Sequence, residues 1–535
     1  MSRDAEVIDP ETDPKATWAL EPDEVAPLLR HVVASPANGT HVPRVPFTGA
    51  PLAAVPRSTP DDVAAAVGRA RAAQRAWAAR PLAERAATVL RFHDLVLDRQ
   101  SEVLDLIQLE NGKARASAYE EVADVALVSR HYGRRAAHYL APQRVPGLVP
   151  GLTGATVLRR PVGVVGIVAP FNYPLVLSVC DALPALVAGN AVVVKPDEQT
   201  PLSILWAAEL LAEAGLPRDV LLVVTGDGAQ VGGALVDAVD HVVFTGSTRT
   251  GRVVAQQAAR RLVGVTLELG GKNAMYVAAD ADPALAAETA VRASFANTGQ
   301  LCMSMERIIL HEAVADAFLA ELLPRVRALR LGAGLDYGSD VGSLTSQAQL
   351  ARVQEHVDGA LRHGARVLVG GVHRTDVGPL FYEPTVLDGV PPDAPVFAEE
   401  TFGPVVAVYR VADDDAAVAM MNDSEFGLNA SVWTRDVARG RALAARIDAG
   451  SVNVNEGYAL SWGTTAAPTG GVKDSGLGRR HGAEGIWATT WTQTVAYHRG
   501  AHRGLGLGRL YALPDEQWTA LFTRALRLMK RLHLP

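Results

Sequence analysis

The spacing of apolar and polar positions changes along this chain of 535 residues and divides it into regions. Between about 59 and 140, apolar residues recur every three or four positions, which predicts amphipathic helices. The first helix should begin at TPDD, 59–62, where proline takes an early helical position and acidic residues fill the first turn. The preceding residues, 1–45, are rich in proline, aspartate and alanine, and we expect them to form an irregular arm.

Short apolar runs follow, rich in β-branched residues and separated by helical segments. Runs such as VVGIV, AVVVK and HVVFT are continuously apolar, which is typical of buried parallel strands. The alternation resumes after residue 272, with helices expected over 283–300 and 312–329, and continues to SVNVN near 455. Repeated alternation of strand and helix predicts the α/β class, with two doubly wound, Rossmann-like domains.

Two extended segments lie outside both repeats. TQTVAYHRG near the carboxyl end could pair as a strand with GATVLRR, which begins at 154. We expect these segments to form a small β element that bridges subunits. The expected division of the chain is an arm, a first domain in two pieces, a second domain, the bridging strands and a tail: 1–45, 46–147 with 161–271, 272–468, 148–160 with 487–500, and 501–535.

Composition excludes several classes of function. The formal net charge is −7, so no basic field points to nucleic acid. The two cysteines cannot build a disulfide framework and are not spaced for a metal site, so we expect no metal and a reducing cytoplasm. The first 20 residues lack the apolar core of a signal peptide, and no uncharged apolar stretch reaches the ~18 to 20 residues of a membrane helix.

Two strand ends in the first domain carry candidate binding groups. In HVVFTGSTRTG, a buried strand runs into Gly246 and Ser247, and a helix with Gly251 in its first turn follows. Such a helix start presents N–H groups to an anion, for instance a pyrophosphate. Lys195 and Glu198 follow another strand, where a carboxylate commonly holds ribose hydroxyls. A plain turn and a surface ion pair are the alternatives, but two such sites in one sheet favour a dinucleotide.

Four longer segments carry a family resemblance. VAPFNYPL, VTLELGGKN, NTGQLCMS and EETFGPV resemble the signature segments of the NAD(P)-dependent aldehyde dehydrogenases, in the family's order, and KPDEQTP, FTGS and TGGVKDSGLGRRHG support the match. The resemblance covers about 45 to 500 and is strongest to the succinate-semialdehyde dehydrogenase branch of actinobacterial type. It implies that the first domain binds NAD, that the second is catalytic, and that the protein is a homodimer or homotetramer. The cofactor residues it implies are Val168, Pro170, Phe171, Asn172, Lys195, Glu198, Gly226, Gly246, Ser247, Gly251, Leu269, Glu400 and Phe402.

The resemblance also implies three catalytic residues. Cys302, which in isolation would be interpreted as a small buried apolar side chain, becomes the nucleophile that forms a thiohemiacetal and then a thioester. Asn172 and the Cys302 N–H would stabilise the oxyanion. Glu268 would activate the water that hydrolyses the thioester, because burial raises the pKa of a carboxyl group toward neutrality. Glu400 should hold the nicotinamide ribose and Phe402 should pack on the ring, whereas Cys180 is expected to be a core residue.

Other functions remain to be weighed. A non-enzymatic relative and a reductase that runs the thioester chemistry backward are both disfavoured by the presence of Asn172, Glu268 and Cys302 together. A broad-specificity aliphatic or aromatic aldehyde dehydrogenase stays open as an alternative to a semialdehyde enzyme.

The substrate is the least determined property. Familiar succinate-semialdehyde dehydrogenases hold the substrate carboxylate with an arginine in a TRK segment, where this chain has Cys180 and Asp181. A second customary arginine is replaced by Ala296, and Thr469 replaces a large apolar residue. If the substrate carries a carboxylate, Arg307 or a cation within 470–481 must bind it.

Glu198 sets the expected cofactor preference. Its carboxylate can accept hydrogen bonds from both adenosine-ribose hydroxyls of NAD, while a 2′-phosphate would place like charges side by side. In a partly buried site that repulsion should exceed ~1 kcal/mol. We therefore expect NAD to be preferred, with NADP as the alternative.

The tail, 501–535, reads as one amphipathic helix. Its apolar residues share one face by their spacing, and its basic residues gather elsewhere. We expect it to pack on the catalytic core or on a neighbouring subunit, and contact with an anionic membrane surface is the alternative. The apolar face comprises Trp518, Leu521, Phe522, Ala525, Met529 and Leu532.

Overall fold

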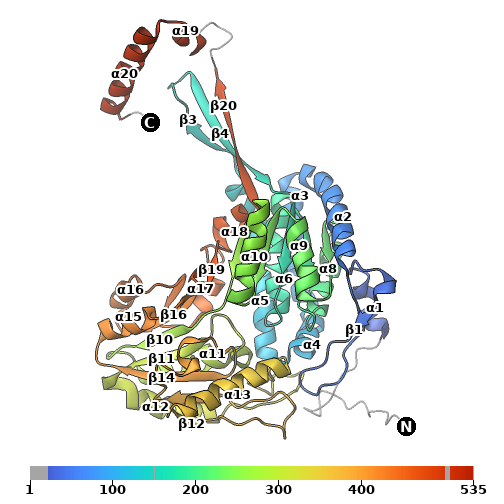
Figure 1. Cartoon of the computed structure of the whole chain (residues 1–535), viewed down its shortest axis with the longest axis vertical. Coiled ribbons are helices and arrows are strands. Elements are labelled where there is room, and N and C mark those ends of the chain that lie inside the picture. Colours follow the sequence, from blue (N-terminus) through green and yellow to red (C-terminus); the bar gives the residue numbers. More distant parts are fainter. Residues whose placement is uncertain (1–21, 150, 500–506, 534–535) are drawn as a thin grey trace.

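The computed structural model describes residues 22–149, 151–499 and 507–533 (Figure 1). Within the arm, α1 (Pro22–Leu29) is a helix that packs on α8 (Leu202–Glu213) and buries Val25. The expectation of an irregular arm is therefore wrong for this part, because the apolar residues of α1 recur at helical spacing and find a helix to pack on. Residues 1–21 of the arm lie outside the described residues.

The first domain begins with four helices that divide between the two faces of its sheet. The first of its helices begins where the sequence predicts, because Thr59 and Asp62 form a reciprocal capping box, with the Thr59 N–H donating to the Asp62 carboxylate at 2.8 Å. On one face lies α2 (Pro60–Ala79), and on the other lie α3 (Leu82–Asp98), α4 (Gln100–Asn111) and α5 (Arg115–Tyr139).

The sheet of the first domain has the strand order β19-β9-β8-β5-β6-β7. Five of its six strands are parallel, and the two-residue strand β19 (Gly476–Leu477) joins antiparallel at one edge. Because parallel strands end at the same edge, the segments after them converge there. The parallel strands are β5 (Val164–Val168), β6 (Ala191–Lys195), β7 (Leu221–Val223), β8 (His241–Thr245) and β9 (Gly264–Glu268). The helices between them are α6 (Pro174–Val179), α7 (Ala182–Ala188), α8, α9 (Gly233–Ala238) and α10 (Thr248–Arg261).

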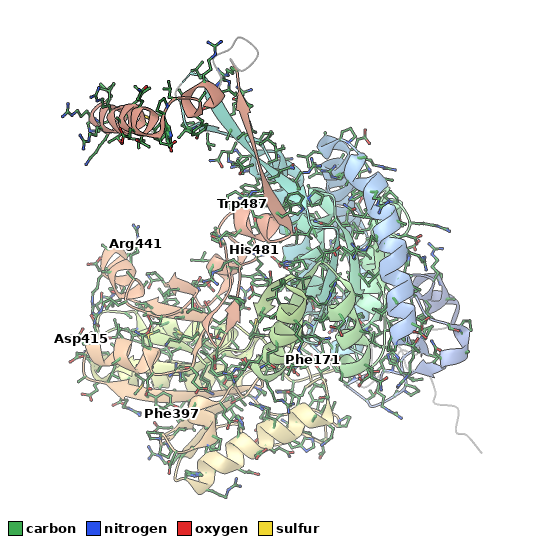
Figure 2. The ribbon with its side chains drawn as sticks, turned by 45° about the horizontal axis from the view of Figure 1, so that its top comes forward. Phe171, Phe397, Asp415, Arg441, His481 and Trp487 are labelled. Carbon is green, nitrogen blue, oxygen red and sulfur yellow. The ribbon has the colours of Figure 1, made fainter. Side chains whose placement is uncertain are left out.

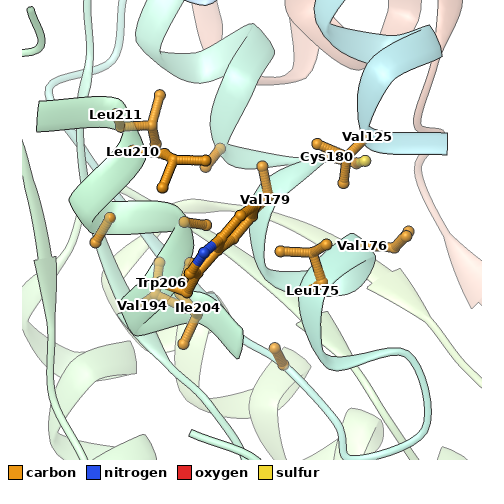
Figure 3. Packing of buried hydrophobic residues seen from close by; sticks show 14 of the residues in the cluster. Val125, Leu175, Val176, Val179, Cys180, Val194, Ile204, Trp206, Leu210 and Leu211 are labelled. Carbon is orange, nitrogen blue, oxygen red and sulfur yellow. The ribbon is translucent and has the colours of Figure 1, made fainter. Parts of the chain in front are cut away.

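Aliphatic side chains surround Trp206 in the core beneath this sheet. Trp206 is 2% exposed and lies among Val179, Val194 and Ile204 (Figure 3). Cys180 is 4% exposed and lies beside Val125 in the same cluster (Figure 3), which confirms that this cysteine is a core residue.

The second domain is built on a seven-stranded sheet of order β12-β13-β14-β11-β10-β16-β17. All of its strands are parallel except β12, which pairs antiparallel with β13. The two parallel, doubly wound sheets confirm the predicted fold class. The strands are β10 (Asn273–Val277), β11 (Met305–His311), β12 (Arg366–Val369), β13 (Thr385–Asp388), β14 (Val405–Val411), β16 (Asn429–Trp433) and β17 (Ser451–Val454).

The helices of this domain are α11 (Pro283–Phe295), α12 (Glu312–Arg327), α13 (Gln347–Arg362), α15 (Asp414–Asn422) and α16 (Val437–Ala444). Helix α11 ends earlier than the predicted residue 300. Asn297 and Thr298 take left-handed conformations, with φ of 50° and 56°, and a right-handed helix cannot continue through them.

A third, antiparallel sheet of β3 (Gln143–Pro146), β4 (Thr153–Pro161) and β20 (Thr490–His498) projects from the body of the molecule (Figure 1). Strand β20 pairs with β4 along its whole length, from Thr490 opposite Pro161 to His498 opposite Thr153. The predicted pairing of TQTVAYH with GATVLRR is thus confirmed.

The tail forms two helices beyond this projecting sheet, α19 (Leu507–Tyr511) and α20 (Asp515–Arg531) (Figure 1). No side chain of α20 is buried, and Leu521 remains 52% exposed. Packing on the core was expected and is wrong, because β20 carries the chain away from the body before the helix begins. Residues 501–506 and 534–535 of the predicted tail lie outside the described residues. No described helix is long and apolar enough to cross a membrane.

Candidate active site

Cys302 lies in a tight turn between α11 and β11. Three successive residues, Asn297, Thr298 and Gly299, have positive φ values. A Cβ on Gly299 would lie 2.0 Å from the Gly403 carbonyl oxygen, so only glycine fits this close approach. The Asn273 side-chain amide donates to the Cys302 carbonyl at 2.7 Å and fixes the position of the thiol.

Two cavities meet at Cys302. The first, of about 240 Å³, extends over the carboxyl edge of the first sheet, and the second, of about 180 Å³, lies between α5, α11 and residues 458–463. Of the residues that line them, Cys302 and Asn172 line both. A thiol placed this way can be approached by one ligand from each side.

Asn172 is held firmly beside the thiol. Its side-chain amide donates to the Gln300 carbonyl at 3.0 Å, and its own carbonyl accepts from Lys113 Nζ at 2.7 Å. Lys113 is in turn paired with Glu121 in a fully buried contact of 2.7 Å. The Asn172 amide is therefore a preorganised donor for negative charge that develops near the Cys302 sulfur.

Glu268 ends strand β9 and lines the first cavity together with Cys302. Its side chain is 9% exposed, and burial raises its pKa to about 7. The Arg480 guanidinium opposes this rise. A carboxyl group that exchanges its proton near neutral pH has the property that a general base requires.

The surroundings of the Cys302 thiol favour its protonated form. Burial raises its pKa to about 12, and the nearby Arg480 guanidinium acts in the opposite direction. Glu400 and Glu268 add to the rise. The thiolate must therefore form as substrate and cofactor assemble, since the thiolate is the reactive species.

Most of the predicted cofactor residues meet in the first cavity. The Phe171 ring, whose position is marked in Figure 2, packs edge-on against Phe402 of the second domain at 5.9 Å between centroids. Glu400 accepts the Gly271 N–H at 2.8 Å. Eight of the predicted residues line this cavity: Pro170, Phe171, Asn172, Gly246, Ser247, Leu269, Glu400 and Phe402.

The other predicted cofactor residues lie outside the lining of this cavity. Val168 and Lys195 are register partners at the ends of β5 and β6. Gly226 follows β7 with φ of 121°, and a Cβ on Gly251 would lie 2.5 Å from the Leu269 side chain, so that Gly251 lets helix and strand pack closely. Glu198 completes the set, in the loop after β6.

These residues fit a dinucleotide. The Oε1 atom of Glu198 is buried without a hydrogen-bond partner, which leaves an acceptor for ribose hydroxyls. Ser247 caps α10 by accepting the Thr250 N–H, and the first turn of this helix faces the cavity edge, where an anion is stabilised. Glu306 accepts the N–H groups of Thr401 and Phe402 and so holds in place the segment that carries Glu400.

Several lining residues were missed by sequence reasoning. Gln349 and Arg352 border the first cavity, and Arg292, Tyr458 and Glu120 border the second. Arg292 lies one helical turn before Ala296, the position where an arginine was sought. That spacing was the available signal, since residues four apart share a helix face.

The cations suggested as carboxylate ligands are placed elsewhere. Arg307 is 2% exposed and donates to backbone carbonyls, among them that of Lys272, so it cannot reach the substrate cavity. Within 470–481, Arg479 donates to the Gly471 carbonyl. Arg480 is buried and pairs with Asp181, which accounts for the acidic residue at the TRK position.

The protein combines two parallel sheets with a thiol between two cavities and a buried carboxyl group beside it, an arrangement that suits a dehydrogenase. The family model described as "Aldehyde dehydrogenase family" matches residues 35–495, and the chain belongs to that family. It is therefore an NAD(P)-dependent oxidoreductase that acts on aldehydes.

Similar proteins indicate a branch within the aldehyde dehydrogenase family. A protein of Mycolicibacterium smegmatis with the provisional name succinate-semialdehyde dehydrogenase, NADP(+), is 51% identical over 91% of this chain and 93% of its own length. One of Mycobacterium tuberculosis with the corresponding name is 48% identical over the same shares. The crystal structure of succinate-semialdehyde dehydrogenase from Burkholderia pseudomallei matches with a TM-score of 0.84 at 34% identity, covering 90% of this chain and 99% of that one.

The expected preference for NAD is contradicted by these relatives, which are named for NADP(+). The argument from Glu198 considered one carboxylate alone. In the structure, the charges that act on His41 include Glu198 but also the cations Arg57 and Lys195. The surroundings of His41 therefore contain positive charge from Arg57 and Lys195 as well as the Glu198 carboxylate.

Proposed function

We propose that this chain oxidises succinate semialdehyde to succinate with NADP⁺. The single observation that carries this proposal is the meeting of the two cavities at Cys302, with a cofactor-type lining on one side and an arginine in the lining of the other. The first domain would bind the dinucleotide, and the second would supply the nucleophile.

In this mechanism the Cys302 sulfur attacks the aldehyde carbon, and the Asn172 amide and the Cys302 N–H donate to the oxyanion that forms. When bound in the first cavity, the dinucleotide would supply the acceptor for the hydride of the aldehyde carbon. Glu268 then takes a proton from the water that attacks the thioester, and the acid is released as the thiol is restored. Phe402 and Glu400 would hold the nicotinamide end, and Lys195 and Glu198 the adenosine end.

The substrate assignment rests on Arg292. Its side chain is 58% exposed, its Nη2 donates to the Glu120 carboxylate at 2.8 Å, and its guanidinium lies 5.8 Å from the centre of the Tyr458 ring. The hydroxyls of Tyr458 and Tyr173 also donate to Glu120, so that this carboxylate is satisfied and orients the guanidinium. The exposed part of the Arg292 guanidinium would bind the substrate carboxylate. The apolar side chains that line the second cavity would contact the methylene groups of the substrate.

Removing the Arg292 charge should weaken the binding of a semialdehyde that carries a carboxylate more than the binding of a neutral aldehyde. We expect Arg292→Gln to raise the KM for succinate semialdehyde about ten- to a hundredfold, because a hydrogen bond to a charged group is worth about 1.5 to 3 kcal/mol. The KM for butanal, which has the same chain length and no carboxylate, should change little. Steady-state kinetics with both aldehydes, and with NADP⁺ and NAD⁺ for the parent enzyme, test this prediction.

Arg292→Lys serves as the matched control, since it keeps the charge and should retain part of the discrimination. Equal changes in KM for both aldehydes would show that Arg292 has a structural role and does not bind the substrate carboxylate. A parent enzyme that prefers butanal, or NAD⁺, would contradict the proposed substrate or cofactor.

We further propose that the protein is a cytoplasmic homo-oligomer in which α20 packs on a neighbouring subunit. Trp491 of the projecting sheet is 49% exposed and Leu528 of α20 is 55% exposed, and a second subunit would cover such apolar surface. Both described cysteines are free, as a reducing compartment allows.

Leu521→Asp should weaken the oligomer, because it places a charge on the apolar face of α20. Thr523→Asp is the matched control: it adds the same charge on the opposite face and should leave the assembly intact. Light scattering after size exclusion measures the mass. If both variants keep the parent mass, and Leu521→Asp instead abolishes sedimentation with anionic vesicles, the membrane alternative replaces this one.

A further inference from the structure

A buried cation lies behind the general base. The Arg480 side chain is 4% exposed, and its Nη2 donates to the Asp181 carboxylate at 2.9 Å and to the Thr245 hydroxyl at 3.2 Å. Its backbone is fixed by two hydrogen bonds to Thr469, with N–H to carbonyl distances of 2.8 and 2.9 Å. The guanidinium is therefore held in one place by contacts from three separate segments.

The same guanidinium faces Glu268 across a short gap. Arg480 Nε lies 3.8 Å from Glu268 Oε1, and both atoms are buried without a hydrogen-bond partner. The distance is too long for a hydrogen bond, so the two charges interact without locking the carboxylate. Glu268 thus stays free to turn toward the cavity, where water would attack the thioester.

The cation is shared among several groups. Asp181 and Glu268 act on it most strongly, and the Cys302 and Cys180 thiols lie within its field. Asp124, His481 and Tyr132 are also close enough to interact with it. Around Glu268 itself the charged groups are Arg480, Asp181 and Arg479, with the Cys302 thiol beside them.

We propose that Arg480, anchored by Asp181, is a positioning residue that keeps Glu268 poised as a carboxylate beside the thioester and so controls the hydrolytic half of the reaction. The proposal rests on the role of Glu268 proposed above. It explains why this chain has an acidic residue at 181, where a substrate-binding arginine was sought: Asp181 serves the base and not the substrate.

The two members of the pair should act on Glu268 in opposite directions. Burial raises the Glu268 pKa to about 7, the Arg480 charge lowers it, and the Asp181 charge raises it. Loss of Arg480 therefore favours the protonated, inactive form of the base, whereas loss of the Asp181 charge favours the carboxylate. Mere damage to the fold would not shift a pH profile in two directions.

The test is the pH dependence of acyl-enzyme hydrolysis in the full-length enzyme, measured by quenched-flow appearance of succinate after a single turnover. Since Glu268 acts as a carboxylate, the parent rate should rise with pH through about 7. We expect Arg480→Gln to move the midpoint up by about one pH unit and Asp181→Asn to move it down by a similar amount, as is typical for charges within about 4 to 6 Å.

Two further variants keep the test decisive. Arg480→Lys retains the positive charge and should restore most of the parent midpoint, which distinguishes charge from shape if Arg480→Gln folds poorly. Arg441→Gln makes the same change at an exposed arginine of the second domain (Figure 2) and should leave the profile unchanged.

Shifts in the same direction for Arg480→Gln and Asp181→Asn, or lower rates with unmoved midpoints, would overturn the proposal. These outcomes are distinct from failure of the proposed function. If the Arg480 and Asp181 variants keep the parent profile while Glu268→Gln blocks hydrolysis, only the positioning role is lost. If Glu268→Gln leaves hydrolysis intact, the base itself has been misassigned.

Discussion

Cys302→Ala should abolish aldehyde oxidation while leaving the binding of NADP⁺ nearly unchanged. The thiol supplies the covalent bond of both proposed intermediates, so its loss should lower kcat by at least about a thousandfold, as removal of a catalytic nucleophile commonly does. Cofactor affinity should survive, because most of the groups that line the first cavity come from other segments. Steady-state turnover and a fluorescence titration with NADP⁺ measure the two effects separately.

The chain provides a matched control in its other cysteine. Cys180→Ala removes a thiol that is 4% exposed in the core, and it should lower thermal stability modestly while keeping turnover within a few-fold of the parent. Prolonged treatment with iodoacetamide should modify Cys302, which lines both cavities, and spare the buried Cys180. Turnover of Cys302→Ala within tenfold of the parent enzyme would exclude Cys302 as the nucleophile.

The main sheets could be predicted because their strands are short, apolar and rich in β-branched residues. Buried parallel strands need no alternation, so AVVVK and HVVFT stand out without any structure. The end of α11 could not be placed in this way. It depends on left-handed conformations at Asn297 and Thr298, and neither residue type requires such a conformation.

Local sequence also could not reveal the contacts that tune the site. Arg480 and Asp181 are 299 positions apart and meet only through the packing of the folded chain. Likewise, Arg292 acquires meaning from Glu120 and Tyr458, which belong to other segments. The position of α20 follows from the direction of β20, and an amphipathic pattern shows that a partner surface is needed without showing which one.

The prediction that NAD is preferred was wrong for a related reason. Glu198 alone predicts repulsion of a 2′-phosphate, but the electrostatic potential at a strand end is a sum over all neighbouring charges. Arg57 precedes the first long helix and Lys195 ends β6, yet both act on the same His41 side chain as Glu198 does. A single residue identified in a motif is therefore weaker evidence for cofactor choice than for the existence of the site.

Glu268→Gln should separate the two halves of the reaction. Glutamine keeps the shape of the side chain but cannot accept the proton of the attacking water. Acylation should still proceed, so mixing with succinate semialdehyde and NADP⁺ should give a burst of NADPH close to one equivalent per active site. Hydrolysis should then slow by about 10² to 10⁴, the usual contribution of a general base.

Stopped-flow absorbance records the burst, and the acyl-enzyme that accumulates should appear in intact-protein mass spectra of the quenched reaction. The parent enzyme should hydrolyse its thioester more slowly below pH 7, because the pKa of Glu268 is raised to about 7 and only the carboxylate can act as the base. In Glu268→Gln this dependence should disappear, since the titrating group is gone.

The matched control is Glu456→Gln, which makes the same change at a carboxyl group outside both cavities and should keep the parent burst and steady state. A Glu268→Gln enzyme that shows no burst at all would place this carboxylate in activation of the Cys302 thiol, and a variant with an unchanged steady-state rate would remove it from the mechanism.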